Sequence, residues 1–483
     1  MKLSQLLQHV SIIQSTVSGD PEIEHIAYDS RKVTPGGMFV AVSGFASDGN
    51  RFIPMAMEKG AALVVTAQKP QEDIPYVLVE SDRLALAQIS CNFFDHPGKS
   101  MTLIGVTGTN GKTSVTWLLK QVLEQVTGSK VGLIGTMENR IGDEVVPTER
   151  TTPESYELQS LFARMRDSDC RYAVMEVSSH AVSLERIGGL TFDVAAFTNL
   201  TEDHLDFHKT MEAYCDAKAE LFARCEAAVF NRDDLWFKRI TALSQCPRIT
   251  YSAKGEAGIF AENVELLSDG IRFMLTSDSM TIPVAVPIPG RFTVYNTLTV
   301  LGILKALGID LKKAVKALET VQGVKGRIEV VPTPGKDYTL LIDYAHTPDG
   351  LDNVLRSVRD FCKGRLISVF GCGGDRDPIK RPIMGRIGVE LSDLAIITSD
   401  NPRTEDPGAI IRDIEAGVTP EMGDYIIIPD RRKAIEFAMD IGRKDDIIVL
   451  AGKGHETYQE IHGVKYHLDE REEVAAYLAK KTC

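Results

Sequence analysis

The chain has 483 residues, of which 43% are hydrophobic and 25% are charged, a balance that is ordinary for a soluble globular protein. Its formal net charge of −13 disfavours nucleic acid and anionic membrane as partners, so an anionic ligand needs local basic groups. At roughly 150 residues per domain, the length predicts about three domains.

The cysteines and the N-terminal segment predict a cytoplasmic protein. The eight cysteines are scattered and none forms a CxxC pair, which favours reduced thiols over a disulfide framework or a zinc site. The first sixteen residues, MKLSQLLQHVSIIQST, are too polar for a signal peptide, and no apolar run approaches the ~18 residues of a membrane span. With the net charge, these features predict neither a membrane nor a nucleic-acid partner. We also expect a monomer, although no motif in the sequence indicates an oligomeric state.

Short apolar runs alternate with turns at the start of the chain. GGMFVAVSG (36–44) and AALVVT (61–66) predict strands, and RFIPMAMEKGA (51–61) predicts the helix between them. DHPGKS (95–100) contains proline and glycine and predicts a linker, so the first domain is expected to span residues 1–98.

A strand, a glycine loop and a helix follow this linker. The strand is MTLIGV and the helix is KTSVTWLLKQVLEQV; further buried-type strands are predicted at KVGLIGT, YAVMEVS, VAAFTNL and AAVFN. Strands that alternate with helices predict a parallel sheet with helices on both faces. Residues 257–290 instead predict antiparallel strands with a turn at Asp269-Gly270, and VYNTLTVLGILKALG predicts a helix.

A second alternation begins after Arg327. Its predicted strands are TLLIDYA, RLISVFG, LAIITSD, YIIIP and DIIVLAG. The fold class is therefore α/β with three domains: residues 1–98, a central P-loop-like parallel sheet with an antiparallel subsheet over 99–326, and a C-terminal Rossmann-like domain over 327–483.

The segment VTGTNGKTS (106–114) predicts a phosphate-binding loop. The strict pattern G-x-x-x-x-G-K-[ST] is not met, because a valine stands at the position of the first glycine. Gly108 and Gly111 still allow backbone N–H groups to face phosphate oxygens, and the positive end of the following helix points to the same place. Lys112 supplies a charge for the β/γ-phosphates and Thr113 a hydroxyl for Mg²⁺, so we predict ATP binding rather than a plain glycine turn.

Two polar residues lie at the carboxyl ends of the central strands, where ligands of open α/β sheets bind. Glu176 lies near the end of the predicted strand YAVMEVS, and His204 lies shortly after VAAFTNL. Each is equally consistent with a metal ligand and with a structural or solvated residue. Lys218, in the helical stretch AYCDAKAELFAR, is by itself typical of a surface lysine.

Three loops of the last domain also follow predicted strands. They are GCGGDRD (371–377), SDNPRTEDP (399–407) and AGKGHE (451–456). Ordinary turn chemistry would explain each of them. Alternatively, Arg376, Arg403 and Glu456 converge on one ligand at the carboxyl edge of the sheet.

Together these motifs resemble those of the Mur ligase family, the ATP-dependent amide-forming enzymes of peptidoglycan precursor synthesis. The matching stretches are YDSRKVTPGGMFVAVSG, TGTNGKTS, EVSSHA, NLTEDHLDFH, YCDAKAELF, GRFTVYN, DYAHTPD, GCGGDRD, DNPRTE and GKGHE. The family's loop is of the TGTNGKT kind, which accounts for the missing first glycine. DNPR is the form associated with meso-2,6-diaminopimelate as the added amino acid.

The resemblance implies roles for individual residues. ATP contacts would be Gly108, Thr109, Asn110, Gly111, Lys112, Thr113, Ser114, Asn296, Arg327 and Asp343. Magnesium would be held by Thr113, Glu176, His204 and Lys218, the last carbamylated; Lys112, Lys218, Glu176 and His204 would form the catalytic group. The UDP-N-acetylmuramoyl-dipeptide would contact Ser30, Thr151, Thr152, Ser178 and Arg186, and the amino acid would contact Arg376, Asp400, Asn401, Pro402, Arg403, Gly452 and Glu456.

The implied reaction joins diaminopimelate to the D-glutamyl γ-carboxylate of UDP-N-acetylmuramoyl-L-alanyl-D-glutamate through an acyl phosphate. Two positions depart from some relatives, since Arg150 stands where they have asparagine and Leu184 where they have glutamine. A lysine-adding ligase is the nearest rival, but arginines suit a second carboxylate. A folylpolyglutamate-type ligase is a more distant rival, and a nucleotide-switched binding protein is a rival from a different functional class.

Overall fold

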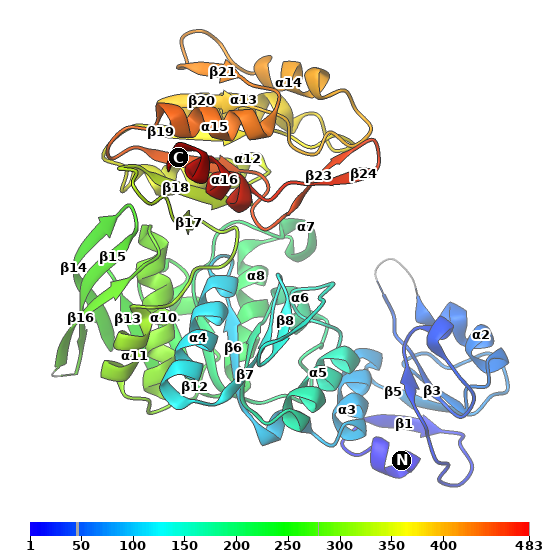
Figure 1. The fold of residues 1–483 in the computed structure, drawn as a ribbon. Helices are drawn as coiled ribbons and strands as arrows, with labels where there is room; N and C mark the ends of the chain where they lie inside the picture. Colours follow the sequence, from blue (N-terminus) through cyan, green and yellow to red (C-terminus); the bar gives the residue numbers. More distant parts are fainter. Residues whose placement is uncertain (45–47, 279, 483) are drawn as a thin grey trace. The chain divides into compact units, whose positions relative to one another are not determined.

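The computed structural model describes residues 1–44, 48–278 and 280–482, and Figure 1 shows its elements in chain order. Contacts divide the chain into two compact units. The first comprises residues 1–252, 256–259 and 299–314; the second comprises residues 253–255, 260–298 and those from 315 onward. In the described part of the chain, every helix is too short or too polar to traverse a bilayer.

The first unit opens with a five-stranded sheet in the order β1-β5-β4-β3-β2. The pairs β2–β3, β3–β4 and β4–β5 are parallel, and β1–β5 is antiparallel. Its elements are α1 (Leu3–Leu6), β1 (Ile12–Ser15), β2 (Ile26–Ala27), η1 (Ser30–Lys32), β3 (Met38–Ala41), η2 (Gly49–Phe52), α2 (Ile53–Glu58), β4 (Leu63–Thr66), β5 (Tyr76–Val79) and α3 (Asp82–Phe93). The predicted strand–helix–strand unit is confirmed as β3, α2 and β4.

Six parallel strands of the same unit form a second sheet in the order β13-β12-β11-β6-β10-β7, and β8 and β9 continue it antiparallel. The strands are β6 (Thr102–Thr107), β7 (Lys130–Ile134), β8 (Asn139–Ile141), β9 (Glu144–Val146), β10 (Cys170–Glu176), β11 (Phe192–Phe197), β12 (Cys225–Asn231) and β13 (Arg248–Ser252). All five predicted strands are present, and β6 lies at the centre, so the loop after it emerges between neighbouring strand ends.

Helices cover this sheet. They are η3 (Pro97–Ser100), α4 (Lys112–Thr127), α5 (Ser155–Asp167), α6 (Ser179–Ser183), α7 (Leu205–His208), α8 (Met211–Ala219), η4 (Glu220–Ala223) and α9 (Phe237–Ile240). The helix α4 contacts β6, β7 and β10, while α5 contacts β10 through a core that includes Leu158, Phe162 and Met165. This packing fixes the start of α4 directly above the end of β6.

The second unit includes all but the first residue of β14 (Ile259–Leu267), together with β15 (Gly270–Ser277) and β16 (Met280–Val286); the three strands are neighbours in one sheet. The pair β15–β16 is antiparallel, as predicted for this segment, and the turn before β15 falls at residues 268–269. The predicted helix is α10 (Arg291–Ala306), followed by α11 (Leu311–Leu318); both continue from one unit into the other.

The remaining chain forms a six-stranded sheet in the order β17-β18-β22-β19-β20-β21, parallel except for β17. The elements of this part of the chain are β17 (Glu329–Val331), β18 (Thr339–Asp343), α12 (Pro348–Arg359), β19 (Leu366–Phe370), α13 (Lys380–Leu391), β20 (Leu394–Ile397), α14 (Pro407–Glu415), β21 (Tyr425–Ile427), α15 (Arg431–Ile441), β22 (Ile447–Ala451), β23 (Tyr458–Ile461), β24 (Val464–His467) and α16 (Glu470–Thr482). The strands β23 and β24 form a separate two-stranded antiparallel sheet. The five predicted strands are confirmed, while β17 and the β23–β24 hairpin were not predicted.

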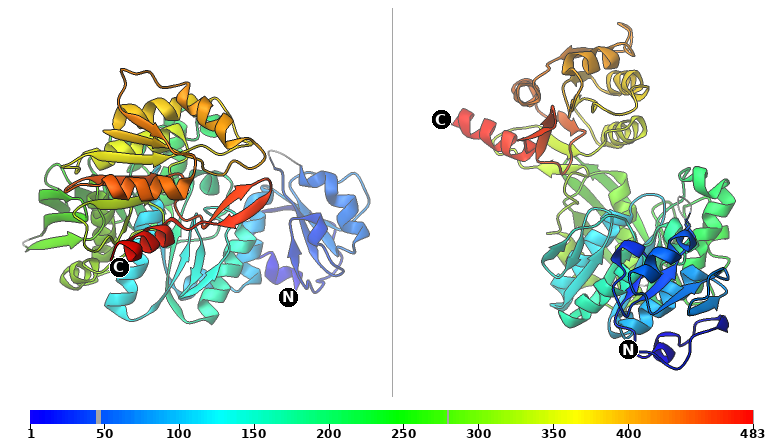
Figure 2. Two further views of the ribbon diagram at one scale, coloured as in Figure 1. Left: turned by 45° about the horizontal axis from the view of Figure 1, so that its top comes forward. Right: turned by 90° about the vertical axis from the view of Figure 1, so that its right-hand side faces the viewer.

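Two separate cores show that helices pack on both faces of this sheet (Figure 2). Leu341 of β18 packs in the core that contains residues of α12, α13 and α14. Its neighbours Leu340 and Ile342 pack in the core that contains residues of α15 and α16. This alternation is the period of two expected of a strand buried on both faces, and it confirms the Rossmann-like prediction.

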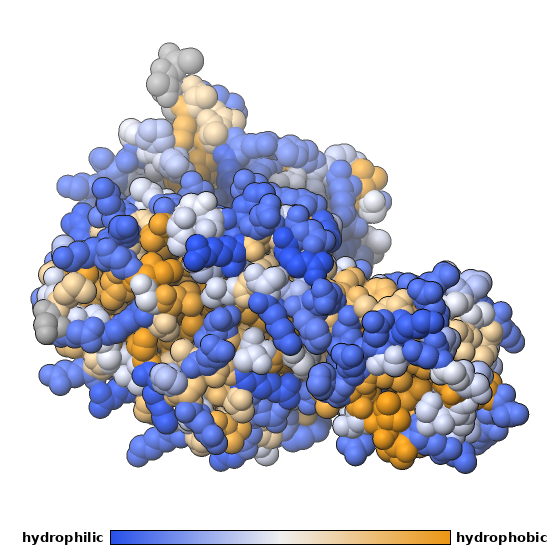
Figure 3. Space-filling model, turned by 90° about the horizontal axis from the view of Figure 1, so that it is seen from below, coloured by the Kyte–Doolittle hydropathy of each residue, from blue (hydrophilic) through white to orange (hydrophobic). Residues whose placement is uncertain are grey.

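Apolar areas also reach the surface. Figure 3 shows them in orange among hydrophilic residues on one face of the molecule. The exposed large hydrophobic side chains include Ile12 and Ile13 of β1, which lies at the end of the five-stranded sheet. No predicted site residue belongs to this strand, so we attach no function to it.

Candidate functional site

The loop between β6 and α4 has the backbone that its glycines predict. Gly108 has φ of +149°, and a Cβ added there would lie 1.9 Å from Thr198 Oγ1. Gly111 has φ of +86° and forms the N-cap of α4. Both conformations disfavour any residue with a side chain, so the two glycines, rather than the missing first one, define this loop.

Residues that follow β11 anchor the loop. Asn199 accepts hydrogen bonds from Thr109 N at 2.8 Å through its carbonyl oxygen and from Asn110 N at 2.9 Å through Oδ1. Thr198 Oγ1 donates to Asn110 O at 2.7 Å. Sequence reasoning missed Thr198 and Asn199, although both lie within or beside the motif NLTEDHLDFH.

Lys112 folds back over the loop that precedes it. Its Nζ donates to Gly108 O at 2.8 Å and to Thr109 O at 2.9 Å. Burial lowers the pKa of Lys112, and the carboxylates of Glu176 and Asp203 act in the opposite direction. An ammonium therefore stands at the place where the predicted β/γ-phosphates would bring negative charge.

The interpretation of Lys218 as a surface lysine is wrong. The residue lies on α8 and is 1% exposed. Its Nζ donates to Gly108 O at 3.0 Å, the same oxygen that Lys112 contacts, and lies 4.5 Å from the ring centroid of Tyr214. Burial, and then the charge of Lys112, holds the pKa of Lys218 well below its usual range. Two amines therefore converge on one carbonyl oxygen of the glycine loop.

Glu176 is held rigidly at the end of β10. It is 1% exposed and accepts hydrogen bonds from both the N and the Oγ1 of Thr136, each at 3.0 Å. Gly135 makes this approach possible, since a Cβ there would lie 2.4 Å from Glu176 Oε1. The glycine-threonine pair that follows β7 is the sequence signal for this contact, and we did not identify it from the sequence.

His204 adopts a left-handed backbone, with φ of +53°, immediately before α7. Its side chain is 46% exposed, with Nε2 3.4 Å from Asp203 Oδ2 and its ring centroid 4.8 Å from that of His180. The charge of Asp203 acts on both Lys112 and Lys218. These groups therefore share one electrostatic environment at the carboxyl end of the central strands.

Within the described ranges, no three or more His, Cys, Asp or Glu residues are grouped as a metal site. The predicted magnesium set is of a different kind, because it combines Glu176 and His204 with the hydroxyl of Thr113 and a modified Lys218. An unmodified ammonium would repel a cation, whereas a buried lysine with a lowered pKa has access to the neutral form. The residues present thus fit magnesium on condition that Lys218 becomes an anion.

Four of the predicted UDP-substrate residues lie close together beside β10. Thr152 Oγ1 donates to Glu176 O at 2.8 Å and accepts from Ser178 N at 3.1 Å. Arg186 donates to Thr152 O at 3.0 Å, and burial lowers its pKa. Thr151 Oγ1 lies 3.0 Å from Thr136 Oγ1. The cluster is linked to Glu176 through Thr136 and Thr152.

Two further positions complete this region of the chain. Arg150, which departs from the asparagine of some relatives, forms an ion pair with Glu154 at 2.8 Å, and Arg186 pairs with the same carboxylate at 3.0 Å. Ser30 lies in η1 of the first domain, with its hydroxyl 3.4 Å from Met55 Sδ. The structure gives Ser30 no hydrogen bond to the Thr152 cluster among the described residues.

In the second unit, the order β22-β19-β20 brings the three predicted loops to one edge of the sheet. Asn401 Nδ2 donates to Glu456 Oε2 at 2.9 Å, and Arg403 Nη1 donates to Gly374 O at 2.6 Å. Arg376 is exposed, and its Nη1 donates to Asp375 O. The three loops therefore contact one another, while convergence of Arg376, Arg403 and Glu456 on one ligand stays a prediction.

The hairpin β23–β24, which was not predicted, supports the DNPR segment. Arg403 has φ of +52°, its N donates to Glu460 O at 3.0 Å, and its Nε lies 3.6 Å from Glu460 Oε2. Gln459 Nε2 donates to Asp400 O at 2.6 Å. Pro402 is buried, and Gly452 has φ of +116°. The hairpin thus fixes an arginine that the sequence alone placed in a loop.

The remaining predicted nucleotide contacts lie in the second unit. Asn296 is 5% exposed on α10. Asp343 accepts backbone hydrogen bonds from Ile328 N and Ala345 N, each at 2.8 Å, and burial raises its pKa. Arg327 is exposed, with its guanidinium 5.6 Å from the Tyr344 ring centroid. Asp343 therefore organises the backbone beside Arg327.

A cavity of about 220 Å³ lies elsewhere in the first unit, lined among others by Cys91, His96, Gln159 and Asp193. None of its lining residues belongs to the predicted sites. The strand-end geometry and the buried charged groups, rather than this cavity, therefore define the candidate sites.

Comparison with known proteins assigns the class. Three family models match successive stretches: the Mur ligase family catalytic domain over residues 22–93, the Mur ligase middle domain over 106–304 and the Mur ligase glutamate ligase domain over 326–454. The chain belongs to the Mur ligase family.

Individual relatives extend the likeness over the whole chain. A Clostridium tetani protein named UDP-N-acetylmuramoyl-L-alanyl-D-glutamate--2,6-diaminopimelate ligase is 48% identical over 98% of each chain. A Clostridium acetobutylicum protein with the same name, numbered 1, is 46% identical over 99% of each. A solved structure of a ligase of that name has a TM-score of 0.77 and 30% identity, covering 97% of this chain and 98% of the other.

The loop geometry generates a stability prediction. Gly108→Ala should lower the melting temperature by several degrees, since the new Cβ meets Thr198 Oγ1 in addition to the strain of positive φ. Gly128→Ala is the matched control, because that glycine has φ of +67° but open space around its Cβ. Thermal unfolding followed by circular dichroism measures both. Equal shifts in the two variants would contradict the close approach at Gly108.

Proposed function

We propose that this protein is an ATP-dependent ligase that joins meso-2,6-diaminopimelate to UDP-N-acetylmuramoyl-L-alanyl-D-glutamate, forming ADP and phosphate, in peptidoglycan precursor synthesis. The observation that carries the proposal is the convergence of Lys112 and Lys218 on Gly108 O in the glycine loop. The names of the relatives, at 46% and 48% identity over nearly the whole chain, support the choice of substrates.

Amide formation from a carboxylate and an amine needs activation, because an oxide is a poor leaving group. The D-glutamyl γ-carboxylate would attack the γ-phosphorus of ATP, giving an acyl phosphate and ADP. The neutral amine would then attack the acyl carbon, and phosphate would leave as the amide forms. Both partners of the first step are anions, so the positive charge of Lys112 and the N-terminus of α4 would stabilise it.

We assign ATP to Gly108, Thr109, Asn110, Gly111, Lys112, Thr113, Ser114, Asn296, Arg327 and Asp343. The first seven line the start of α4, where an anion is favoured. The backbone N–H groups of Thr109 and Asn110 already donate hydrogen bonds to Asn199. These two residues would therefore contact ATP through their side chains or after the loop rearranges.

Thr113, Glu176, His204 and a carbamylated Lys218 would hold magnesium, which would neutralise phosphate charge when bound. The carbamate forms when the neutral amine attacks CO₂ and releases a proton. Burial and the neighbouring Lys112 favour this neutral amine at Lys218. The product is an anionic oxygen ligand, the type that a hard cation prefers.

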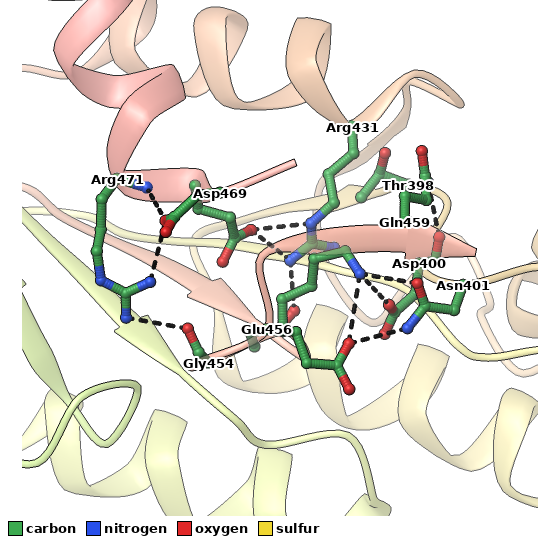
Figure 4. A network of polar contacts seen from close by, with 12 residues as sticks. Thr398, Asp400, Asn401, Arg431, Gly454, Glu456, Gln459, Asp469 and Arg471 are labelled. Carbon is green, nitrogen blue, oxygen red and sulfur yellow. Dashed lines mark hydrogen bonds and ion pairs between the residues drawn. The ribbon is translucent and has the colours of Figure 1, made fainter. Parts of the chain in front are cut away.

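The distal end of the amino acid would be bound by the last domain. Arg403 would pair with the distal carboxylate of diaminopimelate, and Glu456 would hold the distal ammonium. Both described contacts of the Glu456 carboxylate involve Oε2, and in Figure 4 its other oxygen points away from them. Lysine lacks the distal carboxylate, so it would offer Arg403 no anionic partner, which disfavours the lysine-adding alternative.

The UDP-sugar substrate would lie against Ser30, Thr151, Thr152, Ser178 and Arg186. We assign the main role in binding the UDP substrate to residues 1–98, in binding ATP to 99–326 and in binding the amino acid to 327–483. Four of the five UDP contacts nevertheless lie in 99–326, and the ATP contacts Arg327 and Asp343 lie in 327–483. We infer a monomer that acts in the cytoplasm, where its nucleotide substrates are found.

The decisive experiment is a substrate-dependence assay. ADP release should require both the UDP-dipeptide and diaminopimelate, and mass spectrometry should identify the UDP-tripeptide. ADP release that needs neither substrate would favour the nucleotide-switched binding protein. Product formation with a folate and glutamate instead would favour the folylpolyglutamate-type ligase.

Lys112→Ala should leave the fold intact and lower the rate of product formation by about 10²–10³-fold, because the charge facing the phosphates is lost. Lys130→Ala, an exposed lysine of the same domain, is the control and should keep the wild-type rate. Turnover close to wild type in a folded Lys112→Ala protein would refute the phosphate-loop assignment.

Lys218→Ala should abolish activity, and a short carboxylic acid in solution should restore part of it by supplying the missing oxygen ligand. Lys218→Arg, which keeps a cation but cannot be carbamylated, should be as inactive. Native mass spectrometry should detect the added mass of CO₂ on the wild type in bicarbonate and on neither variant. Full activity of Lys218→Ala in bicarbonate-free buffer would overturn the carbamate.

Arg403→Ala should lower kcat/KM for diaminopimelate by about 30- to 1000-fold, because a charge-assisted pair with the amino acid is removed. It should spare the KM for ATP, since Arg403 is not among the residues assigned to ATP. Discrimination against L-lysine should shrink, since lysine never makes this contact. Arg412→Ala, an exposed arginine of α14, is the control. Steady-state kinetics with both amino acids measure the ratio, and an unchanged ratio would refute the assignment.

A further inference from the structure

Lys453 lies at the centre of a polar network in the loop between β22 and β23, as Figure 4 shows for the surrounding residues. Its side chain is 0% exposed. Nζ donates to Asn401 Oδ1 at 2.9 Å and to Tyr458 O at 2.7 Å, and it lies 3.2 Å from Asp400 Oδ1. Two oxygens thus accept hydrogen bonds from the ammonium, and a carboxylate oxygen lies beside it; a buried ammonium needs such partners.

The partners of Lys453 are the residues assigned to the amino acid. Asn401 accepts from Lys453 through Oδ1 and donates through Nδ2 to Glu456 Oε2 at 2.9 Å. The same Oδ1 also accepts from Glu460 N at 2.9 Å. Glu456 Oε2 lies 3.6 Å from the ammonium itself. One buried cation therefore sets the orientation of side chains from two loops.

Asp400 depends on this cation for its charge. Burial would raise the pKa of Asp400, but the charges of Lys453 and Arg431 outweigh burial and hold its pKa below the usual range. Its Oδ1 is buried, and the contact with Nζ lies outside hydrogen-bonding geometry. The pair is therefore electrostatic, and loss of the ammonium would leave a buried carboxylate unpaired.

Other cations hold the backbone of the same loop. Arg431 of α15 donates to Ala451 O at 2.9 Å and pairs with Glu470 at 2.7 Å. Arg471 of α16 donates to Gly454 O at 3.0 Å, as Figure 4 also shows. The backbone on either side of Lys453 is thus fixed without the ammonium. The ammonium itself mainly contacts the side chains of Asp400, Asn401 and Glu456.

A buried ion pair by itself is weak evidence for stability, because the cost of removing charges from water offsets their attraction. The value of Lys453 therefore lies in orientation. We propose that Lys453 is a positioning residue that fixes Asp400, Asn401 and Glu456 for the incoming amino acid without touching it. This inference rests on the proposed function and deepens its amino-acid site.

The test compares Lys453→Met, which has a similar length but no charge, with the wild type. The KM for diaminopimelate should rise by about 30- to 1000-fold, since one partner of a buried charge network is lost. The KM values for ATP and the UDP-dipeptide should change by less than about threefold, because none of the described polar contacts of Lys453 involves a residue assigned to those substrates. Lys363→Met, at an exposed lysine before β19, is the matched control and should behave as wild type.

A partial reaction separates positioning from general destabilisation. Isotope exchange between ADP and ATP that depends on the UDP-dipeptide, without amino acid, reports acyl phosphate formation and should proceed normally in Lys453→Met. Lys453→Gln keeps a donor for Asn401 and should show a smaller rise in KM. If the wild type makes no UDP-tripeptide, the proposed function fails before this comparison is reached.

Three outcomes would overturn the positioning role. One is an unchanged KM for diaminopimelate in folded Lys453→Met, and another is an equal loss in the exchange reaction. The third is failure of both Lys453→Met and Lys453→Gln to fold, judged by circular dichroism, which would make Lys453 a residue of the scaffold.

Discussion

Burying an ammonium in a protein is costly unless oxygen acceptors surround it, and both candidate sites are arranged around this constraint. In the first unit, Lys112 and Lys218 are held against Gly108 O. In the second, Lys453 is buried among Asn401, Asp400 and Tyr458. The contacts between the amines and their acceptors hold the surrounding loops in place. The conformation of each loop and the charge of its site therefore depend on the same contacts.

The two units meet this constraint in different ways. Lys112 and Lys218 have backbone carbonyl acceptors, and burial lowers the pKa of each amine; the charge of Lys112 lowers the pKa of Lys218 further. An anionic ligand or modification would offset this positive charge. Lys453 has a carboxylate beside it and is balanced within the protein. The first arrangement suits a site that receives negative charge, and the second suits a support that stays unchanged while a substrate comes and goes.

The position of both sites follows from parallel sheets. The loop after β6 lies between strands that all end at the same edge of their sheet. In the last domain, the strand order β22-β19-β20 likewise brings the loops that follow these strands to one edge. Hydrophobic packing on both faces, such as the division of Leu340 and Leu341 between two cores, holds these edges fixed. Polar residues at strand ends are thereby brought together although they are distant in sequence.

The sequence by itself determined the elements and the loop chemistry. Buried strands such as LAIITSD and the glycines 108 and 111 carry local signals, because burial on both faces and positive φ restrict which residues fit. The separate hairpin β23–β24 was missed, since its residues are half-buried or exposed and show no continuous apolar run. Only the tertiary structure decided that Lys218 is buried and that Lys453 contacts Asn401. The sequence does not distinguish a surface lysine from a buried one, because burial depends on acceptors supplied by residues far away in the chain. Here Gly108 supplies the acceptor for Lys218, and Asp400 and Asn401 supply oxygens for Lys453.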